Sequence, residues 1–489
     1  MQLNSNGYDI VKSDNKSFIP PRVVVVGGGF SGVAFSVQLA RKTKMPVAID
    51  VVEPRALLGA GLAYSTSDPS HRINVPASKM SVFADQPGHF EDWLRRGDEL
   101  AHDAGAWSWP GGQAYPRRAV FGRYVASLVE ETNQCPQNRR IAHIRDRVIA
   151  AEYHGDRYRL RFKSGAQRSA DLLVLATGHP LPVVPALLTA ALGDDPRIIR
   201  DPSQDGALDG IQKCGAVLVI GTALTMADAV ASLDRVGHIG TITAFSRRGL
   251  LPRGHAAAAL LPFDHFKSTK SPDAALDLLR LVRHGVSVAE RDGLPWQAAF
   301  DDLRSNASRL WQALPLVEQR RFLRHCRSYW DVHRYRVAPQ VEAVIERKRS
   351  NGSLEVQAAS LKAVQQHNDR IQVTLRPRAS AANVEIHRVV DAIVVAAGPA
   401  HASIIEHNAA LGALARQGHI RADPNQLGLD VDRLSRAIGI DDEANPTLLV
   451  AGPLARGRFG ELMGLPQVSE HAEAVASLAA GWLDANFAT

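Results

Sequence analysis

The stretch Arg22-Val-Val-Val-Val-Gly27-Gly28-Gly29-Phe30-Ser31-Gly32 decides the fold of this chain. The run of valines is typical of a buried parallel strand, and the spacing Gly27-x-Gly29-x-x-Gly32 follows it directly. Glycines at these positions allow a tight turn and let a pyrophosphate approach the N–H groups at the start of a helix. The stretch therefore predicts a Rossmann-like dinucleotide-binding unit. A turn needed only for packing the helix on the strand is the alternative.

A second turn of the same kind, in a degenerate form, stands near the middle of the chain. Ala216-Val-Leu-Val-Ile-Gly221-Thr222-Ala223-Leu224-Thr225 again leads from an apolar strand into a turn. Ala223 replaces the second glycine of the pattern and Met226 replaces the third. Because alanine still leaves some room for a phosphate, we predict a second nucleotide site. A vestigial domain is the alternative interpretation.

The residue beyond the next strand distinguishes the two nucleotides. Glu53 closes the predicted strand 47–52, and a carboxylate there accepts hydrogen bonds from a ribose diol. Arg247 and Arg248 follow the predicted strand 241–245, where arginines suit a 2′-phosphate. The sequence therefore predicts two cofactors, FAD at the first turn and NADPH at the second. Two adjacent arginines are also common in solvated loops, which is the alternative for this pair.

The chain is predicted to consist of two similar halves. Each half carries a hairpin-like stretch (148–162 and 361–375) and then a buried strand that ends in glycine (171–178 and 391–398). Helical spacing of leucines and valines indicates an insert in the second half and a helix near the end of the chain. The predicted fold is α/β, with two Rossmann-like dinucleotide-binding domains and a helical insert: 1–21 a flexible tail, 22–205 and 385–489 the FAD-binding domain, 211–270 and 349–384 the NADPH-binding domain, and 271–348 the insert.

Composition excludes several other classes of protein. The 489 residues carry a formal net charge of +7, but the basic residues are scattered, so we expect anionic cofactors and no nucleic acid. No apolar run is long enough to span a membrane and no signal segment is recognisable, so we expect a cytoplasmic protein without membrane contact. Cys135, Cys214 and Cys326 form no CxxC pair, which argues against a metal site and a dithiol reductase.

Three further segments are candidates for the flavin site. Small residues in 59–65 and 71–77 would let backbone lie along a flavin, and Gly452-Pro453 would bring the N-terminus of the last helix near its pyrimidine ring. Buried strands and turns without a ligand are the alternative. We assign to FAD the residues Gly27, Gly29, Phe30, Ser31, Gly32, Glu53, Asn74, Thr177, Gly178 and Gly452, and to NADPH the residues Gly221, Thr222, Leu224, Thr225, Arg247 and Arg248.

The densest polar and aromatic cluster is Trp330-Asp-Val-His-Arg-Tyr-Arg336, inside the predicted insert. It is interpreted either as an interdomain network or as a lid over the substrate or nicotinamide. As a lid, it offers Arg334 to hold an anionic group and His333 beside it, with Asn74 as a further candidate. No catalytic side chain is certain, because the flavin itself would carry the chemistry, at its C4a atom. Sequence patterns of zinc hydrolases, serine hydrolases and P-loop enzymes are missing.

Taken together, these motifs resemble the FAD/NAD(P)-binding family of bacterial flavoproteins. The resemblance rests on Gly27–Gly32, Glu53-Pro-Arg55 and Asn74-Val-Pro-Ala77, and on Gly221–Asp228 and Trp330–Arg334 in the second half. It implies NADPH-dependent flavin hydroxylases, among them a urate hydroxylase and an amino-acid N-hydroxylase. Ala223 departs from the usual glycine. The chain also lacks the FxGxxxHxxx(W/Y) linker of Baeyer–Villiger and flavin-containing monooxygenases, so their substrate rules do not apply.

Three functions remain in competition. The first is an FAD- and NADPH-dependent monooxygenase that uses O₂ to hydroxylate a small polar, anionic, nitrogenous substrate. From the resemblance, urate is the first substrate expected, which would mean purine metabolism, and an amino acid hydroxylated on nitrogen is the second. The alternatives are an NADPH-dependent flavin reductase that passes electrons to a protein or quinone, and a non-catalytic flavoprotein sensor.

Overall fold

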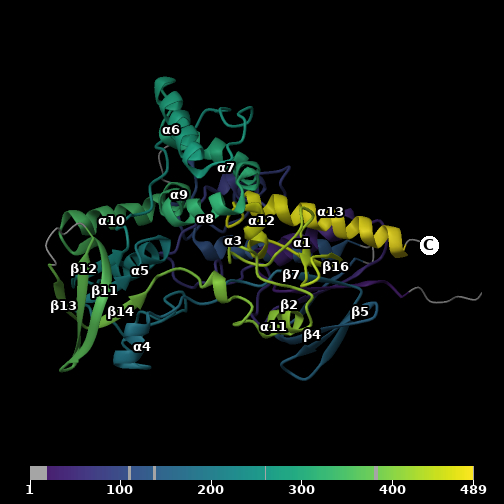
Figure 1. Ribbon diagram of the computed structural model, residues 1–489, viewed down its shortest axis with the longest axis horizontal. Coiled ribbons are helices and arrows are strands. Elements are labelled where there is room, and N and C mark those ends of the chain that lie inside the picture. Colours follow the sequence, from purple (N-terminus) through teal and green to yellow (C-terminus); the bar gives the residue numbers. More distant parts are fainter. Residues whose placement is uncertain (1–18, 108–111, 136–138, 259, 379–383, 488–489) are drawn as a thin grey trace, which may run out of the picture.

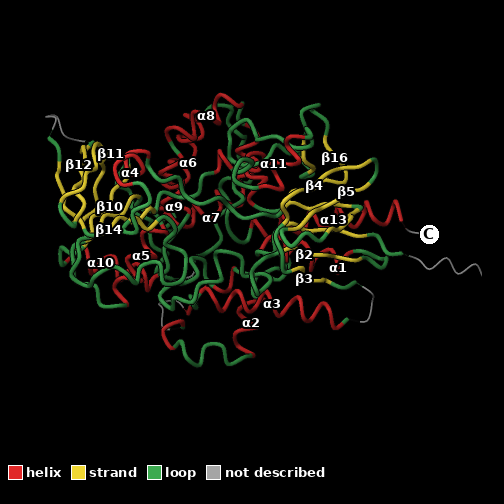
Figure 2. Tube along the Cα trace, turned by 90° about the horizontal axis from the view of Figure 1, so that it is seen from below, coloured by secondary structure: helices red, strands yellow, loops and turns green. Residues whose placement is uncertain are grey.

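A computed structural model gives the structure of residues 19–107, 112–135, 139–258, 260–378 and 384–487. Two β-sheets lie at opposite ends of an elongated molecule, and helices fill the space between and above them (Figures 1 and 2). The predicted α/β fold is confirmed. Most of the predicted tail, residues 1–18, lies outside the described residues. Within the described residues, no helix is long and apolar enough to cross a membrane.

The first sheet is buried on both faces, as the valine run of its central strand requires. Val23 and Val25 of β1 point into a cluster with helices α1, α3 and α13, whereas Val24 and Val26 point into a cluster with a small antiparallel sheet and α11. The order is β15-β16-β7-β1-β2-β3, parallel except for β15. The strands are β1 (Arg22–Val26), β2 (Ala48–Val52), β3 (Ile141–Ile144), β7 (Leu172–Leu175), β15 (Arg436–Ile438) and β16 (Ala444–Val450).

The elements that cover this sheet include the hairpin predicted at 148–162. Helices α1 and α13 pack against each other on one face, and α11 packs on β4 at the other. The covering elements are α1 (Phe30–Lys42), α3 (Arg118–Gln134), α11 (Ala409–Arg416), α13 (Gln467–Phe487), β4 (Val148–His154), β5 (Arg157–Phe162) and β6 (Gln167–Ala170), with α2 (His89–Arg96) beside α3 and α12 (Arg456–Phe459) after β16.

The second sheet is also covered by helices on both faces, and β9 has the position in it that β1 has in the first sheet. Helices α5 and α10 cover one face and α4 covers the other. The order is β13-β12-β11-β10-β9-β14-β8, and the predicted hairpin at 361–375 is the antiparallel pair β11–β12. The elements are α4 (Ala186–Leu192), α5 (Leu224–Arg235), α10 (Pro339–Ser350), β8 (Ile198–Ile199), β9 (Val217–Ile220), β10 (Ile242–Ser246), β11 (Leu354–His367), β12 (Arg370–Pro377), β13 (Ile386–Val390) and β14 (Ala392–Val395).

Each of the two glycine turns lies in close contact with the backbone at the end of a neighbouring strand. Gly27 has φ +106° and Gly221 has φ +121°, a region that L side chains rarely adopt. A Cβ atom on Gly27 would overlap the carbonyl oxygen of Ala176, beyond the end of β7, and a Cβ on Gly221 would overlap that of Ala396, beyond β14. Each turn therefore rests directly on the backbone of the neighbouring strand's end.

The predicted domain boundaries at 205 and 385 are wrong, because backbone pairing assigns both margins to the second sheet. β8 pairs in parallel with β14, and β13 pairs with β12, although residues 198–199 and 385–395 were expected in the first domain. The predicted insert is also too long: α10 packs on α5 as part of the second domain. The insert is formed by α6 (Ala275–Arg291), α7 (Trp296–Ala313), α8 (Leu316–His325) and α9 (Arg327–Arg334), and α6 and α7 project from the top of the molecule in Figure 1.

Polar contacts lock the two domains together. Arg118, at the start of α3, makes a two-pronged ion pair with Asp228 of α5, with donor–acceptor distances of 2.8 and 2.9 Å. Nearby, Arg235 Nε donates to Asp68 at 3.0 Å, and His71 Nε2 lies 3.0 Å from Ser232 Oγ. These contacts hold the two domains in one relative orientation.

Candidate cofactor and substrate site

The first turn has the features that a bound dinucleotide needs. Gly29 is the N-cap of α1, and no side chain caps the helix, so its first N–H groups are open to an anion. The carboxylate of Glu53 is buried and held in place: Oε2 accepts the N–H of Gly28 at 3.1 Å, and Oε1 accepts the backbone and guanidinium N–H groups of Arg55 at 3.1 Å. The predicted acidic residue therefore lies against the turn.

Other residues assigned to FAD gather at the same edge of the sheet. Gly452 has φ +81°, and a Cβ there would overlap the Ser31 hydroxyl, so the end of β16 lies against the start of α1. Thr177 Oγ1 is buried without a hydrogen-bond partner among the described residues, and the space beside Gly178 is open. An unpartnered hydroxyl next to side-chain-free backbone fits a cofactor with polar atoms. The residues present therefore fit FAD.

Sequence reasoning missed His471, whose ring is hydrogen-bonded to the backbone of Gly452 and holds the turn after β16 in place. Its Nδ1 accepts the N–H of Gly452 at 3.1 Å, so its proton is on Nε2, which donates to Ser435 Oγ at 2.8 Å. Burial lowers the pKa of His471 to about 4, and the ring stays neutral at physiological pH. A histidine at the start of the last helix was the only sequence signal available for it.

Asn74 has a different environment from the other FAD candidates. Its side-chain oxygen accepts the N–H of Ala338 at 3.3 Å, and its carbonyl accepts from His255 Nε2 at 3.0 Å. Both partners belong to segments that flank the insert. The described contacts of Asn74 join the first domain to the insert, and they show no contact with the glycine turn; its assignment to flavin or catalysis stays a prediction.

The second turn holds the loop that carries the two arginines. Thr222 donates its hydroxyl to Leu250 O at 2.6 Å and lies 2.9 Å from Ser246 Oγ. Ala223 is the N-cap of α5, which begins at Leu224 and Thr225, and no side chain caps this helix either. The turn thus repeats the open helix start of the first one. Its alanine does not change the approach of Gly221 to the neighbouring strand.

The two arginines of this loop differ in whether their guanidinium groups already have hydrogen-bond partners. Arg248 donates to the Tyr329 hydroxyl at 3.0 Å and to His325 O at 3.1 Å, and its guanidinium lies 4.8 Å from the centre of the Tyr329 ring. Arg247 is exposed, and its guanidinium makes no hydrogen bond within the part of the chain that the structure describes. Arg248 therefore ties the loop to the insert, whereas Arg247 is available to a ligand.

The prediction that Arg334 holds a substrate anion is wrong. Its side chain is 1% exposed and forms a buried ion pair with Glu461, which lies 127 residues further along the chain. The guanidinium also stacks 3.6 Å from the centre of the Tyr335 ring. Burial lowers the pKa of Arg334 to about 10, opposed by the charge of Glu461, so the guanidinium stays charged at neutral pH. Arg334 does not line the cavity of the insert.

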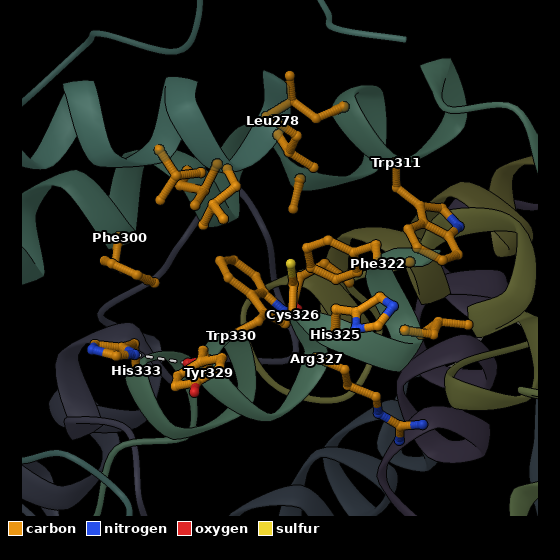
Figure 3. Close-up of a pocket in the computed structure, with 18 of the residues that line it drawn as sticks. Leu278, Phe300, Trp311, Phe322, His325, Cys326, Arg327, Tyr329, Trp330 and His333 are labelled. Atoms are coloured by element: carbon orange, nitrogen blue, oxygen red, sulfur yellow. Dashed lines mark hydrogen bonds between the residues drawn. The ribbon is translucent and has the colours of Figure 1, made fainter. Parts of the chain in front are cut away.

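That cavity has a volume of about 850 Å³ and lies among α6, α7, α8 and α9. Figure 3 shows Leu278 on one side and Cys326, Trp330 and Arg327 on the opposite side. His333 lines it too; its Nδ1–H donates to Tyr329 O at 2.7 Å, and its ring stacks on Phe300 with centroids 4.8 Å apart. The aromatic lining residues are Trp296, Phe300, Trp311, Phe322, Tyr329 and Trp330.

The floor of the cavity comes from the first domain. Arg456, Gly460 and Glu461 follow Gly452 and reach the lining from below the insert. Sequence reasoning missed this segment, although two arginines and a glutamate between Gly452 and the last helix were a visible signal. Beside it, His179 and His401, on the two segments that cross between the domains, meet edge to face with ring centroids 4.7 Å apart. Burial, aided by the positive charge of Arg456, lowers the pKa of His179 to about 4 and that of His401 to about 3.

Comparison with known proteins agrees with this geometry. Residues 24–180 match the family described as FAD-NAD(P)-binding. Within these residues the chain is similar to that family. The match includes most of β1, the first glycine turn, Glu53 and the crossing segment up to His179. No curated protein sequence matches the chain.

Solved structures share the fold over nearly the whole chain. An ornithine hydroxylase from Pseudomonas aeruginosa is 17% identical, with a TM-score of 0.62 over 95% of this chain and 99% of that one. An ornithine N-hydroxylase from Kutzneria sp. 744, solved with reduced FAD, NADP⁺ and L-ornithine, is 16% identical, with a TM-score of 0.59 over 94% and 98%. An L-lysine 6-monooxygenase from Pseudomonas syringae is 16% identical, with a TM-score of 0.59 over 96% and 99%. At this identity the likeness establishes a common fold.

The assignment of the first turn predicts that Gly29→Trp loses FAD. A Cβ on Gly29 lies 3.4 Å from Gly61 Cα, so an indole there would fill the space in which the pyrophosphate meets α1. FAD per chain, measured by absorbance on purified protein, should fall to a small fraction of the wild-type value. Gly88→Trp is the control for added bulk, because nothing lies within 4 Å of its Cβ. Full flavin occupancy in a correctly folded Gly29→Trp protein would contradict the assignment.

The buried ion pair predicts a loss of stability for Arg334→Met. Removing Arg334 leaves the buried Glu461 with only the more distant Arg304, 3.9 Å away, and breaking a buried pair typically costs about 3–5 kcal/mol. The free energy of unfolding, from urea titration, should fall by that order, and Arg334→Met/Glu461→Gln should recover part of it. Arg280→Met removes an exposed pair with Asp277 and should cost at most about 1 kcal/mol. Equal effects of Arg334→Met and Arg280→Met would show that the buried pair is not what holds the insert on the first domain.

Proposed function

We propose that the protein is an FAD-dependent monooxygenase that consumes NADPH and O₂ and hydroxylates a nitrogen atom of a small molecule. The observation that carries this proposal is that one cavity, lined by the insert and the first domain, is connected through two of its lining residues to the arginine loop of the second domain. Arg456 and Glu461 approach it from the first domain, whereas Tyr329 and the backbone of His325 bind Arg248 of the second. A substrate in this cavity would be held between the two nucleotide sites.

The chain's own residues supply binding and shielding. The chemistry that FAD supplies when bound is hydride acceptance from NADPH and activation of O₂. The N–H groups at the start of α1 would hold its pyrophosphate, and Glu53 would accept hydrogen bonds from its ribose. Arg247 would bind the 2′-phosphate of NADPH. The aromatic walls of the cavity would exclude water from the reacting atoms.

The solved structures support nitrogen as the site of hydroxylation. The two ornithine enzymes and the lysine enzyme all act on amino acids with a side-chain amine, and each spans the same two-domain fold with 98% or more of its length. Urate, the first substrate expected from the sequence resemblance, is named by none of the three. An amine nitrogen therefore replaces urate as the proposed target. A reductase that only passes electrons onward has no use for a cavity of this size, which disfavours that alternative.

Coenzyme preference separates the two arginines. Arg247→Gln should raise the KM for NADPH at least about tenfold and leave that for NADH nearly unchanged, because a charge-assisted hydrogen bond contributes roughly 1.5–3 kcal/mol. Arg248→Gln should affect both coenzymes alike, because it loosens the loop from Tyr329. The check is steady-state NADPH and NADH oxidation by both variants. If Arg247→Gln weakened both coenzymes equally, its role would be structural.

The monooxygenase activity predicts coupled consumption of NADPH and O₂. Purified FAD-loaded protein should oxidise NADPH in air faster when a panel of amines contains a substrate, and the fraction of O₂ released as peroxide should then fall. NADPH, O₂ and peroxide are measured together, with the FAD-depleted Gly29→Trp protein as control. NADPH oxidation that needs ferricyanide and does not respond to O₂ would instead identify a reductase.

A further inference from the structure

The size and lining of the insert cavity do not match a compact polar substrate. Its volume of about 850 Å³ lies in the upper part of the roughly 300–1,000 Å³ range of small-molecule pockets. Its walls are dominated by aromatic and aliphatic side chains from α6 to α9. None of the residues of either glycine turn lines it, so the turns that would hold the pyrophosphate groups lie outside the cavity. A short diamino acid would leave most of these apolar walls facing water.

The charged groups of the lining are mainly positive. Arg456 is 5% exposed, yet its only hydrogen bond within the described residues runs from Nε to Gly460 O at 3.4 Å, and no carboxylate pairs with it there. Arg327 has one long ion pair, 3.4 Å from Nε to Asp331 Oδ2, and Arg283 lies exposed on α6. A buried guanidinium without a carboxylate costs free energy unless a ligand anion pairs with it.

Glu461 does not make the net charge of the cavity lining negative. It is the carboxylate of the lining, and its Oε1 is buried without a hydrogen bond within the described residues. However, Oε2 pairs with Arg334, and Oε1 lies 3.9 Å from Arg304 Nε, so two guanidinium groups already flank it. Oε1 can accept one N–H from a ligand, but Arg456 and Arg327 keep the cavity positive as a whole.

We propose that the substrate has a bulky, apolar, ring-bearing body and one anionic group that pairs with Arg456, in contrast to a compact polar amine. The aromatic walls bury the body of this substrate, and Glu461 Oε1 is placed to accept an N–H from its nitrogen. The inference rests on the proposed function, since it names the substrate class of the same hydroxylase. The anionic group of this substrate would lie at the floor of the cavity, beside Arg456.

Binding to the FAD-loaded protein tests this without turnover. Isothermal titration calorimetry compares 2-naphthylacetate with 2-(2-naphthyl)ethanol, which has the same ring system and no charge, and with L-ornithine and urate. We expect 2-naphthylacetate to bind at least about tenfold more tightly than the alcohol, and ornithine and urate to bind more weakly than both. Binding of ornithine or urate in preference to both naphthyl compounds would overturn the proposal.

Variants of residues inside and outside the cavity lining show where the naphthyl compounds bind. Arg456→Met should weaken 2-naphthylacetate at least about tenfold and leave the alcohol unchanged. Arg327→Met gives a second test of the positive floor, with a smaller loss in the same direction, if Arg456→Met does not fold. Val286→Trp adds bulk to the lining and should abolish binding of both naphthyl compounds, whereas Val317→Trp, exposed on α8 and outside the lining, should change neither.

The remaining outcomes are distinguishable. If Arg456→Met loses FAD and keeps its affinity for 2-naphthylacetate, Arg456 serves the cofactor and the anionic part of the proposal is overturned. If Val286→Trp leaves binding intact, the cavity is not the site. If 2-naphthylacetate binds as expected but NADPH and O₂ are not consumed together with any amine, the proposed function fails while the ligand class stands. If coupled consumption occurs with ornithine and no naphthyl compound binds, the reverse holds.

Discussion

The structure depends on a backbone contact that a side chain would prevent. In each of the two large sheets an inner strand, β1 or β9, leads into a glycine that rests on the carbonyl of the neighbouring strand's end, Ala176 for Gly27 and Ala396 for Gly221. This contact sets where the following helix starts, and therefore where its open N–H groups point. The two candidate nucleotide sites therefore take their positions from these two turns.

Buried charge is the second constraint on the site. Arg334 and Glu461 form a buried pair where the insert meets the first domain, and Arg118 and Asp228 form a partly buried pair where the two domains meet. Such pairs contribute little net free energy by themselves, but each is costly to break, so they restrict how the parts can move. Arg456 is different, because its charge lies at the same junction and has no carboxylate partner within the described residues. Burial, with the positive charge of Arg456 as a smaller cause, lowers the pKa of His179 and His401 in the crossing segments.

Local features of this chain could be predicted from its sequence, whereas long-range ones could not. The glycine turns, Glu53, both hairpins and the last helix follow from patterns within a few residues, and all were found. The domain margins were misplaced because the pairing of β8 with β14 joins segments far apart in sequence, and nothing local marks it. Arg334 was misread for the same reason: an exposed lid arginine and one buried against Glu461 have identical neighbours in sequence. The cavity exists only where four helices fail to fill the space between their apolar faces.

The insert leaves the second sheet after β10 and returns at β11, and these two strands are direct parallel neighbours, with Ile242 opposite Leu354. The chain therefore leaves this strand pair at Ser246, at the carboxyl end of β10, and returns at Leu354, at the amino end of β11, so both connections are anchored on neighbouring strands of one sheet. α10 packs on the second domain just before β11. The second domain therefore remains complete whichever helices lie between β10 and α10. In evolutionary terms this is a modular arrangement: a lineage can exchange α6 to α9, and with them the ligand preference, while inheriting both nucleotide sites unaltered. Chimeric enzymes with grafted inserts could be built at these same two strand ends.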